Sequence, residues 1–263
     1  MDNCESMINL EKLNDPKILS DFRVKEEGDY YFCKVKRSKF TVTIPKTIDW
    51  KISYLAGVLA GDGSVKMTNR KVSKYPRVSL EIFNNSLEYL KYADKLFGDI
   101  YNIKGRLRKK PDKNCYILAI NNKVTWLYFN KVLGFLTGKK DCLRVPEKLR
   151  NPALLKHFIA GLIDTDGYKT NTFGLMMSGS NSKFLEEIAE LTDYFYSLKF
   201  YGPYHSTVHQ NGKIRYRAIL SLARTQSNFQ KFRELILLRH PRFNEWARRE
   251  SNPRSLPCKG SVC

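Results

Sequence analysis

Two aspartates occupy equivalent places in a stretch of sequence that occurs twice. Asp62 is the eighth residue of "LAGVLAGDG", and Asp166 is the eighth residue of "IAGLIDTDG". Both stretches read as apolar helices, so each carboxylate is expected at a helix C-terminus, where unpaired carbonyls already carry partial negative charge. A divalent cation would reverse that unfavourable interaction, and an all-oxygen site favours Mg²⁺ over zinc. The pattern therefore predicts a two-carboxylate metal site; the alternative is that each Asp-Gly pair forms an ordinary turn.

Small residues predict how the two carboxylates come together. Small residues recur at positions 56, 57, 60 and 61, and again at 160, 161 and 165. This spacing lines one helix face, and a face without bulk lets another backbone approach closely. We expect the two helices to pack on each other at Gly57 and Gly161, and we expect Gly63 and Gly167 to be left-handed cap residues.

The elements around the two stretches recur in the same order. The offset of 104 positions is too long for a solenoid repeat and indicates two copies of one domain. Each copy reads as helix, two strands, helix, two strands, helix, which predicts an α+β fold of two pseudo-symmetric αββαββα units with antiparallel sheets. The predicted division is a basic N-terminal extension (1–48) with a two-stranded element, a first unit (49–140), a linker (141–150), a second unit (151–245) and a basic C-terminal tail (246–263).

The charge of the chain points to a polyanionic partner. The formal net charge is +20 over 263 residues, of which 42% are hydrophobic. Nucleic acid is the leading candidate and an anionic membrane surface the alternative. The sequence has no apolar run long enough to span a bilayer, no secretory signal and no arginine-rich transit peptide. The six cysteines lack metal-binding spacing and are expected to be reduced thiols, which favours the cytoplasm or an organellar matrix or stroma.

Rows of alternating polar residues predict the surface that contacts DNA. A single row of this kind is more often an ordinary solvated strand face, but several rows in so basic a chain favour contacts with phosphates and base edges. The residues of these rows, with a lysine that follows the second repeat, are Lys66, Thr68, Arg70, Arg77, Ser79, Glu81, Lys104, Arg106, Arg108, Lys169, Arg215 and Arg217.

These motifs resemble those of the LAGLIDADG homing endonucleases of the single-chain, two-motif type. The resemblance covers about residues 50 to 245; the second motif is a near match, and the first departs at its sixth position, where Ala60 stands for the usual aspartate. The resemblance implies sheets that form a DNA-binding saddle in the major groove of a long asymmetric site. It also implies cleavage of both strands with Mg²⁺, for which Mn²⁺ can substitute. A monomer is expected, because both halves of the pseudo-twofold are present.

The resemblance also implies roles for particular residues. Asp62 and Asp166 match the metal carboxylates, and the carbonyls of Gly61 and Thr165 match those that face the metals. Asn85 and Asn181 match the polar residue that ends the second strand and positions water. Lys139, or its neighbour Lys140, matches the lysine that follows the last helix of a unit. The second unit has no lysine there, and Arg239, His240 and Arg242 are the candidates to replace it.

Other functions on this fold remain open from the sequence. Some family members act on their host intron RNA as splicing factors, and nothing in the sequence excludes this. A DNA-binding regulator without cleavage is disfavoured, because both Asp62 and Asp166 are present. An intein is not expected, since the chain starts with Met1 and ends in "SVC".

Overall fold

The computed structural model describes residues 22–35, 40–69, 75–111, 113–138, 140–170, 174–210 and 213–243. Within these ranges the two predicted units have the same order of elements, so the predicted α+β class and the αββαββα order are confirmed. The first unit consists of α1 (Trp50–Gly61), β4 (Gly63–Thr68), β5 (Arg77–Asn84), α2 (Leu87–Tyr101), β6 (Arg106–Lys109), β7 (Tyr116–Ile120) and α3 (Lys123–Leu127), which continues as the π-helical turn η2 (Tyr128–Val132). The second consists of α4 (Pro152–Asp166), β8 (Gly167–Lys169), β9 (Leu175–Gly179), α5 (Ser182–Tyr196), β10 (Phe200–Gln210), β11 (Lys213–Leu222) and α6 (Gln226–Leu235).

Short 3-10 helices lie between the two units and after α6. Two of them, η3 (Lys140–Cys142) and η4 (Glu147–Leu149), lie in the link between the units, and η5 (Pro241–Phe243) follows α6. Asn151 then starts α4 as its N-cap, with its side chain accepting from the N–H of Leu154 at 3.0 Å and proline at the first helical position. Asp49 starts α1 in the same way through the N–H of Ile52.

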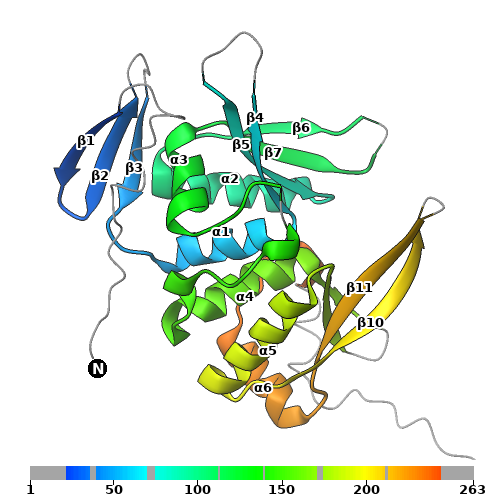
Figure 1. The fold of residues 1–263 in the computed structure, drawn as a ribbon. Helices are drawn as coiled ribbons and strands as arrows, with labels where there is room; N and C mark the ends of the chain where they lie inside the picture. The colour runs from blue at the N-terminus through cyan, green and yellow to red at the C-terminus, as the bar shows by residue number, and fades with distance from the viewer. Residues whose placement is uncertain are drawn as a thin grey trace, which may run out of the picture.

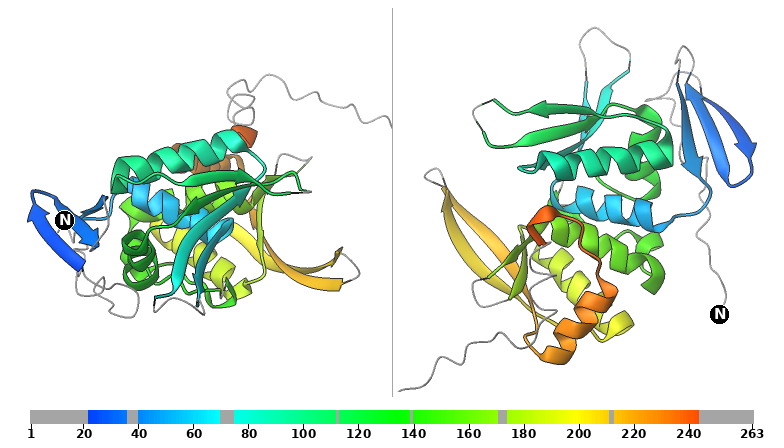
Figure 2. Two further views of the ribbon diagram at one scale, coloured as in Figure 1. Left: turned by 90° about the horizontal axis from the view of Figure 1, so that it is seen from above. Right: turned by 180° about the vertical axis from the view of Figure 1, so that it is seen from behind.

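Helices α1 and α4 lie side by side at the centre of the molecule (Figure 1). All residues of α1 from Ile52 onward are buried, as expected for a helix with apolar neighbours on every side. The two four-stranded antiparallel sheets have the orders β4-β5-β7-β6 and β10-β11-β9-β8 and lie on either side of this helix pair. Helix α2 covers the inner face of the first sheet and α5 that of the second (Figures 1 and 2).

Gly63 and Gly167 begin strands β4 and β8 and are not left-handed caps, so that prediction is wrong. Gly167 has φ −77°, and Gly63 is absent from the residues with positive φ. Glycine is required for a different reason: each strand turns straight back along the helix it follows. A Cβ on Gly63 would lie 2.4 Å from the Leu59 carbonyl oxygen, and one on Gly167 would lie 2.5 Å from that of Ile163.

The N-terminal extension contains a three-stranded antiparallel sheet, whereas two strands were predicted. Its strands are β1 (Phe22–Glu27), β2 (Tyr30–Val35) and β3 (Thr41–Pro45), in that order across the sheet. Strand β1 has little sequence signal, because "FRVKEE" is exposed throughout the part whose burial is described. The sheet lies beyond the N-terminal end of α1 (Figures 1 and 2), whereas Asp62 caps the C-terminal end of that helix. Within the described ranges, no helix is both long and apolar enough to cross a membrane.

Candidate metal and nucleic-acid site

Asp62 and Asp166 lie at neighbouring helix ends. Asp62 is the C-cap of α1, and its N–H donates to the Val58 carbonyl at 3.1 Å. Asp166 is the last residue of α4, and its carboxyl carbon would lie 3.3 Å from a Cβ built on Gly61. The Asp166 carboxyl group therefore packs against the last turn of α1. Both side chains are half-buried, so solvent and a ligand can reach them.

Asn84, and not Asn85, is the polar residue that contacts Asp62. Asn84 ends β5 and is buried, and its Nδ2 donates to Asp62 Oδ2 at 2.9 Å. The strand register explains the difference. Gly63 pairs with Ile82, and the Phe83 N–H donates to the Asp62 carbonyl, which places Asn84 beside the helix end. Side chains alternate along an extended chain, so Asn85 points the other way and is exposed.

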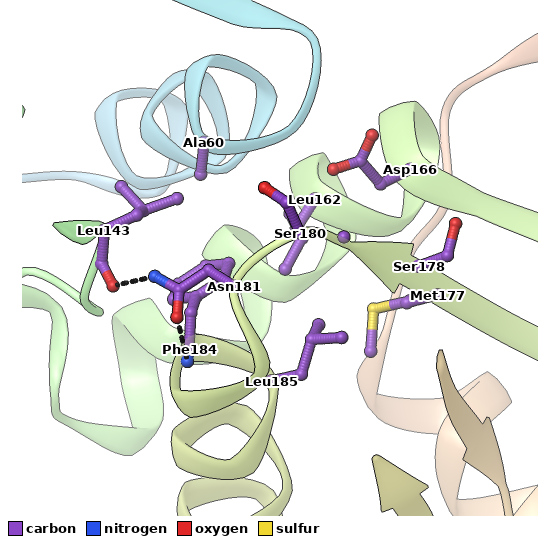
Figure 3. A pocket seen from close by; sticks show the side chains of 11 residues that line it. Ala60, Leu143, Leu162, Asp166, Met177, Ser178, Ser180, Asn181, Phe184 and Leu185 are labelled. Atoms are coloured by element: carbon purple, nitrogen blue, oxygen red, sulfur yellow. Dashed lines mark hydrogen bonds between the residues drawn. The ribbon is translucent and has the colours of Figure 1, made fainter. Parts of the chain in front are cut away.

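Asn181 has a different role from the one expected for it. It is the N-cap of α5: its Oδ1 accepts from the Phe184 N–H at 3.1 Å, and its Nδ2 donates to the Leu143 carbonyl at 2.9 Å (Figure 3). Ser86 caps α2 in the same way in the first unit. Since Gly167 pairs with Met177 as Gly63 pairs with Ile82, the counterpart of Asn84 is Gly179. At this position of the second unit, glycine therefore stands where the first unit has the amide that contacts Asp62.

A small pocket of about 40 Å³ lies beside Asp166 (Figure 3). Ala60 and Gly179 line it, and their lack of side-chain bulk leaves the space between the two units. Ser178 and Ser180 add polar atoms to the lining. A space of this size suits one or two water molecules and excludes a nucleotide, so any nucleic acid must approach from outside the helix pair.

Arg242 caps the C-terminal end of α4 from the chain that follows α6. Its Nη2 donates to the carbonyls of Ile163, Asp164 and Thr165 at 3.1, 2.7 and 2.8 Å. The Thr165 carbonyl, expected to face a metal, thus already has a protein donor, and the Thr165 hydroxyl donates to carbonyls of its own helix. Burial lowers the pKa of Arg242, while the carboxylates of Asp62, Asp164 and Asp166 act in the opposite direction.

Asp164 anchors the same returning segment to both helices. Its Oδ2 accepts from the Tyr54 hydroxyl of α1 at 2.7 Å and from the Arg239 N–H at 2.8 Å. Burial raises the pKa of Asp164 to about 6, although these hydrogen bonds and Arg242 oppose the rise. The equivalent residue of the first unit is Ala60, so the anchor exists in one unit only. The behind view in Figure 2 shows this segment returning from α6 to the ends of α1 and α4.

The structure separates the three candidates for the missing second lysine. Arg242 is the one whose charge interacts with both Asp62 and Asp166. His240 contacts Asn84 at 3.2 Å, and the Arg239 guanidinium lies 4.7 and 4.8 Å from the ring centres of Trp50 and Tyr54. Lys139 lies outside the described residues, as does the side chain of Lys140.

The predicted DNA-binding rows of the first unit share one face of its sheet, which we call the groove face. Strand register places them opposite the core residues, since Val65, Leu80 and Leu118 point to the helices. On the strands, this face carries Lys66, Thr68, Arg77, Ser79, Glu81, Arg106 and Arg108. Glu81 is buried beneath this basic layer and forms ion pairs with both Lys66 and Arg108. Lys104 is exposed just before β6, and Arg70 lies outside the described residues.

In the second unit the prediction for Lys169 is wrong. Lys169 pairs with Leu175, whose side chain is in the core, so Lys169 points to the helix side of the sheet. Its Nζ lies 5.8 Å from the ring centre of Phe243. Arg217 pairs with Ser206, and both point away from the buried side chain of the neighbouring Ala218. We call this outer face the groove face of the second sheet. Arg215 is two residues before Arg217 on β11, so alternation predicts the same face for it. Its side chain is outside the part of the chain that the structure describes.

Comparison with known proteins agrees with this architecture. A family model described as a LAGLIDADG-like domain matches residues 49–134, which is most of the first unit. One curated relative is a component of the A-type ATP synthase of Pyrococcus abyssi, 32% identical over 136 residues. Another is glutamine–fructose-6-phosphate aminotransferase (isomerizing) of Methanocaldococcus jannaschii, 30% identical over 151 residues. The matches cover 51% and 56% of this chain but only 12% and 13% of those proteins.

Solved structures share the fold over about three quarters of this chain. One is the homing endonuclease I-DmoI in complex with DNA and Ca, with a TM-score of 0.55, 19% identity, and coverage of 77% of this chain and 98% of that one. Another is I-DmoI with DNA and Mn, with a TM-score of 0.52, 20% identity, and coverage of 73% and 98%. The first unit thus matches a LAGLIDADG-like domain, and the chain shares the two-unit fold of the I-DmoI structures.

Proposed function

We propose that this protein is a site-specific DNA endonuclease that cuts both strands with the help of a divalent metal ion. The observation that carries the proposal is the placement of Asp62 and Asp166 at the adjacent ends of α1 and α4, between two sheets. Arginines and lysines lie on the groove face of the first sheet, and Arg217 lies on that of the second. Two carboxylates thus lie where a DNA backbone held by both sheets would pass.

The donor set fits Mg²⁺ or Mn²⁺. No group of three or more His, Cys, Asp or Glu side chains able to hold a metal occurs within the described ranges. Mg²⁺ is commonly bound by only one or two carboxylates, with water and substrate phosphates completing its shell, and Asp62 and Asp166 match that pattern. When bound, such a metal lowers the pKa of the attacking water and stabilises the leaving oxygen. The related structures of I-DmoI with DNA and Mn or Ca support this choice.

The other residues of the site have roles that follow from their positions. Asn84 orients the Asp62 carboxylate through its 2.9 Å hydrogen bond. Arg242, near both carboxylates, balances their charge while DNA is absent and adds positive potential for the scissile phosphates. Lys66, Arg106 and Arg108 hold the phosphate backbone along the first sheet. Because one chain supplies both halves of the site, the protein acts as a monomer on double-stranded DNA.

Substitution of the two carboxylates tests the proposal. Sites that the protein cuts are first selected from a randomised plasmid library with Mg²⁺ or Mn²⁺, and defined double-strand cuts are expected. Asp62→Asn and Asp166→Asn should each abolish double-strand cutting yet bind the selected site as tightly as the unaltered protein. Asp193→Asn, which changes an exposed aspartate on α5, is the matched control and should cut normally. Unchanged cutting by either Asp62→Asn or Asp166→Asn would exclude the two-carboxylate site.

A further inference from the structure

We propose that His240 is a positioning residue that orients the Asp62 carboxylate for its cation through Asn84. The three side chains form a hydrogen-bonded chain that joins the two units. His240 Nε2 lies 3.2 Å from Asn84 Oδ1, and Asn84 Nδ2 lies 2.9 Å from Asp62 Oδ2. The inference rests on the proposed function, because it concerns the cation that Asp62 would bind.

The backbone sets the direction of the hydrogen bonds in this chain. The Arg242 N–H donates to His240 Nδ1 at 3.1 Å, so Nδ1 carries no proton in the neutral ring. The proton is then on Nε2, which donates to Asn84 Oδ1. The Ser86 N–H also donates to Asn84 Oδ1, at 2.9 Å, so the amide nitrogen of Asn84 must face Asp62. Each bond in the chain therefore fixes the orientation of the next group.

Because His240 and Asn84 are buried, water cannot readily replace the hydrogen bond between them. His240 is 4% exposed and Asn84 is 6% exposed. The imidazole also packs on the Tyr89 ring, with 4.6 Å between ring centres. Burial and the nearby Arg242 charge lower the pKa of His240 to about 4, which keeps the ring neutral near pH 7. Removing a group that hydrogen-bonds to a metal ligand typically lowers metal affinity about 10- to 100-fold. His240 is one hydrogen bond further from the ligand than Asn84, so a smaller effect is expected.

The device serves one carboxylate only. The second unit has Gly179, which carries no side-chain amide, in the place of Asn84, so the hydrogen-bonded chain from His240 runs to Asp62. A change at His240 should therefore affect the Asp62 half of the site and leave the Asp166 half nearly unaltered. A general loss of packing would not distinguish the two halves.

The tautomer provides a test that does not depend on cleavage. In the protein labelled with ¹⁵N-histidine, the ring signals of His240 are assigned by NMR as those that disappear in His240→Asn. These signals should show a neutral ring protonated at Nε2 at pH 7. Finding the His240 ring in the Nδ1–H form would overturn the proposal, because Nε2 could then not donate to Asn84.

Metal affinity tests the consequence. Mn²⁺ binding is measured by electron paramagnetic resonance in an Asp166→Asn background, which leaves the Asp62 half of the site. His240→Asn keeps an acceptor where Nδ1 was but removes the donor to Asn84, and it should weaken Mn²⁺ binding about threefold to tenfold. His240→Gln restores a donor near the Nε2 position and should bind Mn²⁺ within about twofold of the background protein. Thermal unfolding without metal should show both variants folded.

The outcomes separate this inference from the proposed function. Equal Mn²⁺ affinity in the His240→Asn variant and the background protein, or equal loss in both His240 variants, would overturn the positioning role and leave the metal site standing. If the protein bound no Mn²⁺ in a manner that requires Asp62, both the metal site and the positioning role would be wrong.

Discussion

Gly57 of α1 and Gly161 of α4 contact each other's helices at equivalent points. A Cβ on Gly57 would lie 1.9 Å from the Phe158 carbonyl oxygen and 2.9 Å from the Leu162 nitrogen. A Cβ on Gly161 would lie 2.2 Å from the Tyr54 carbonyl oxygen and 2.9 Å from the Val58 nitrogen. The contacts are reciprocal because the two helices are related by the pseudo-twofold of the repeat. This close approach is what brings the helix ends, and with them the two aspartates, together.

Gly57→Ala should therefore destabilise the protein more than an ordinary glycine substitution in a helix. The added methyl must push the α4 backbone away, at a cost of about 3 kcal/mol or more, and urea unfolding followed by circular dichroism measures the loss. The control is Gly98→Ala on α2, where the nearest atom to the new Cβ is 3.6 Å away and alanine should stabilise the helix by about 0.5–1 kcal/mol. Similar effects at both positions would contradict the close helix packing.

Removing one groove-face arginine should reduce the salt dependence of DNA binding. Arg106→Gln should make the negative slope of the logarithm of the DNA association constant against the logarithm of the salt concentration shallower by about 0.9. This is the value expected for one lost phosphate contact on duplex DNA. Lys169→Gln removes the same charge on the helix side of the second sheet and should leave the slope unchanged. Fluorescence anisotropy with a labelled duplex at several salt concentrations measures both. A loss as large for Lys169 as for Arg106 would show that the groove face is not the binding surface.

Arg242→Met should destabilise the protein by about 2–4 kcal/mol, since it leaves three carbonyls at the end of α4 without their charged donor. The measurement is the free energy of unfolding in urea. Lys183→Met, at an exposed position on α5, is the control and should change that free energy by less than about 0.5 kcal/mol. An Arg242 variant as stable as the control would argue against the capping role.

His157 should make the protein less stable in mild acid. Burial, with the Lys156 and Arg239 charges, lowers the pKa of His157 to about 4, below its usual 6.5. As the pH falls below about 6.5 the unfolded chain takes up a proton that the folded protein does not, so stability is lost. After discounting for the partial exposure of His157, the expected loss from pH 7 to pH 5 is about 1 kcal/mol.

His157→Gln isolates this contribution. The stability of the variant relative to the unaltered protein should improve as the pH falls from 7 to 5, and thermal unfolding at both pH values measures the difference. Comparing the two proteins at each pH cancels Asp164, whose raised pKa acts in the opposite direction. A difference in stability that does not change with pH would show that His157 titrates normally in the fold.

Some features of the protein could be read from the sequence because local patterns carry them. The repeated small residues predicted the pairing of α1 with α4, and helical periodicity is enough to say which face they share. Alternation along β4, β5 and β6 predicted the groove face, since every second side chain of a strand points the same way. The paired aspartates then followed from their fixed place at the end of each repeat.

Tertiary structure alone decided which side chains complete the site. The choice of Asn84 over Asn85 depends on a one-residue register between β4 and β5, which the hydrophobic pattern did not specify. Strand β8 has only three residues, too few for alternation to reveal the side on which Lys169 lies. The contacts of Arg239, His240 and Arg242 join positions 75 to 156 residues apart. No local pattern encodes such contacts, because they exist only once α6 has packed and the chain after it returns across α1 and α4.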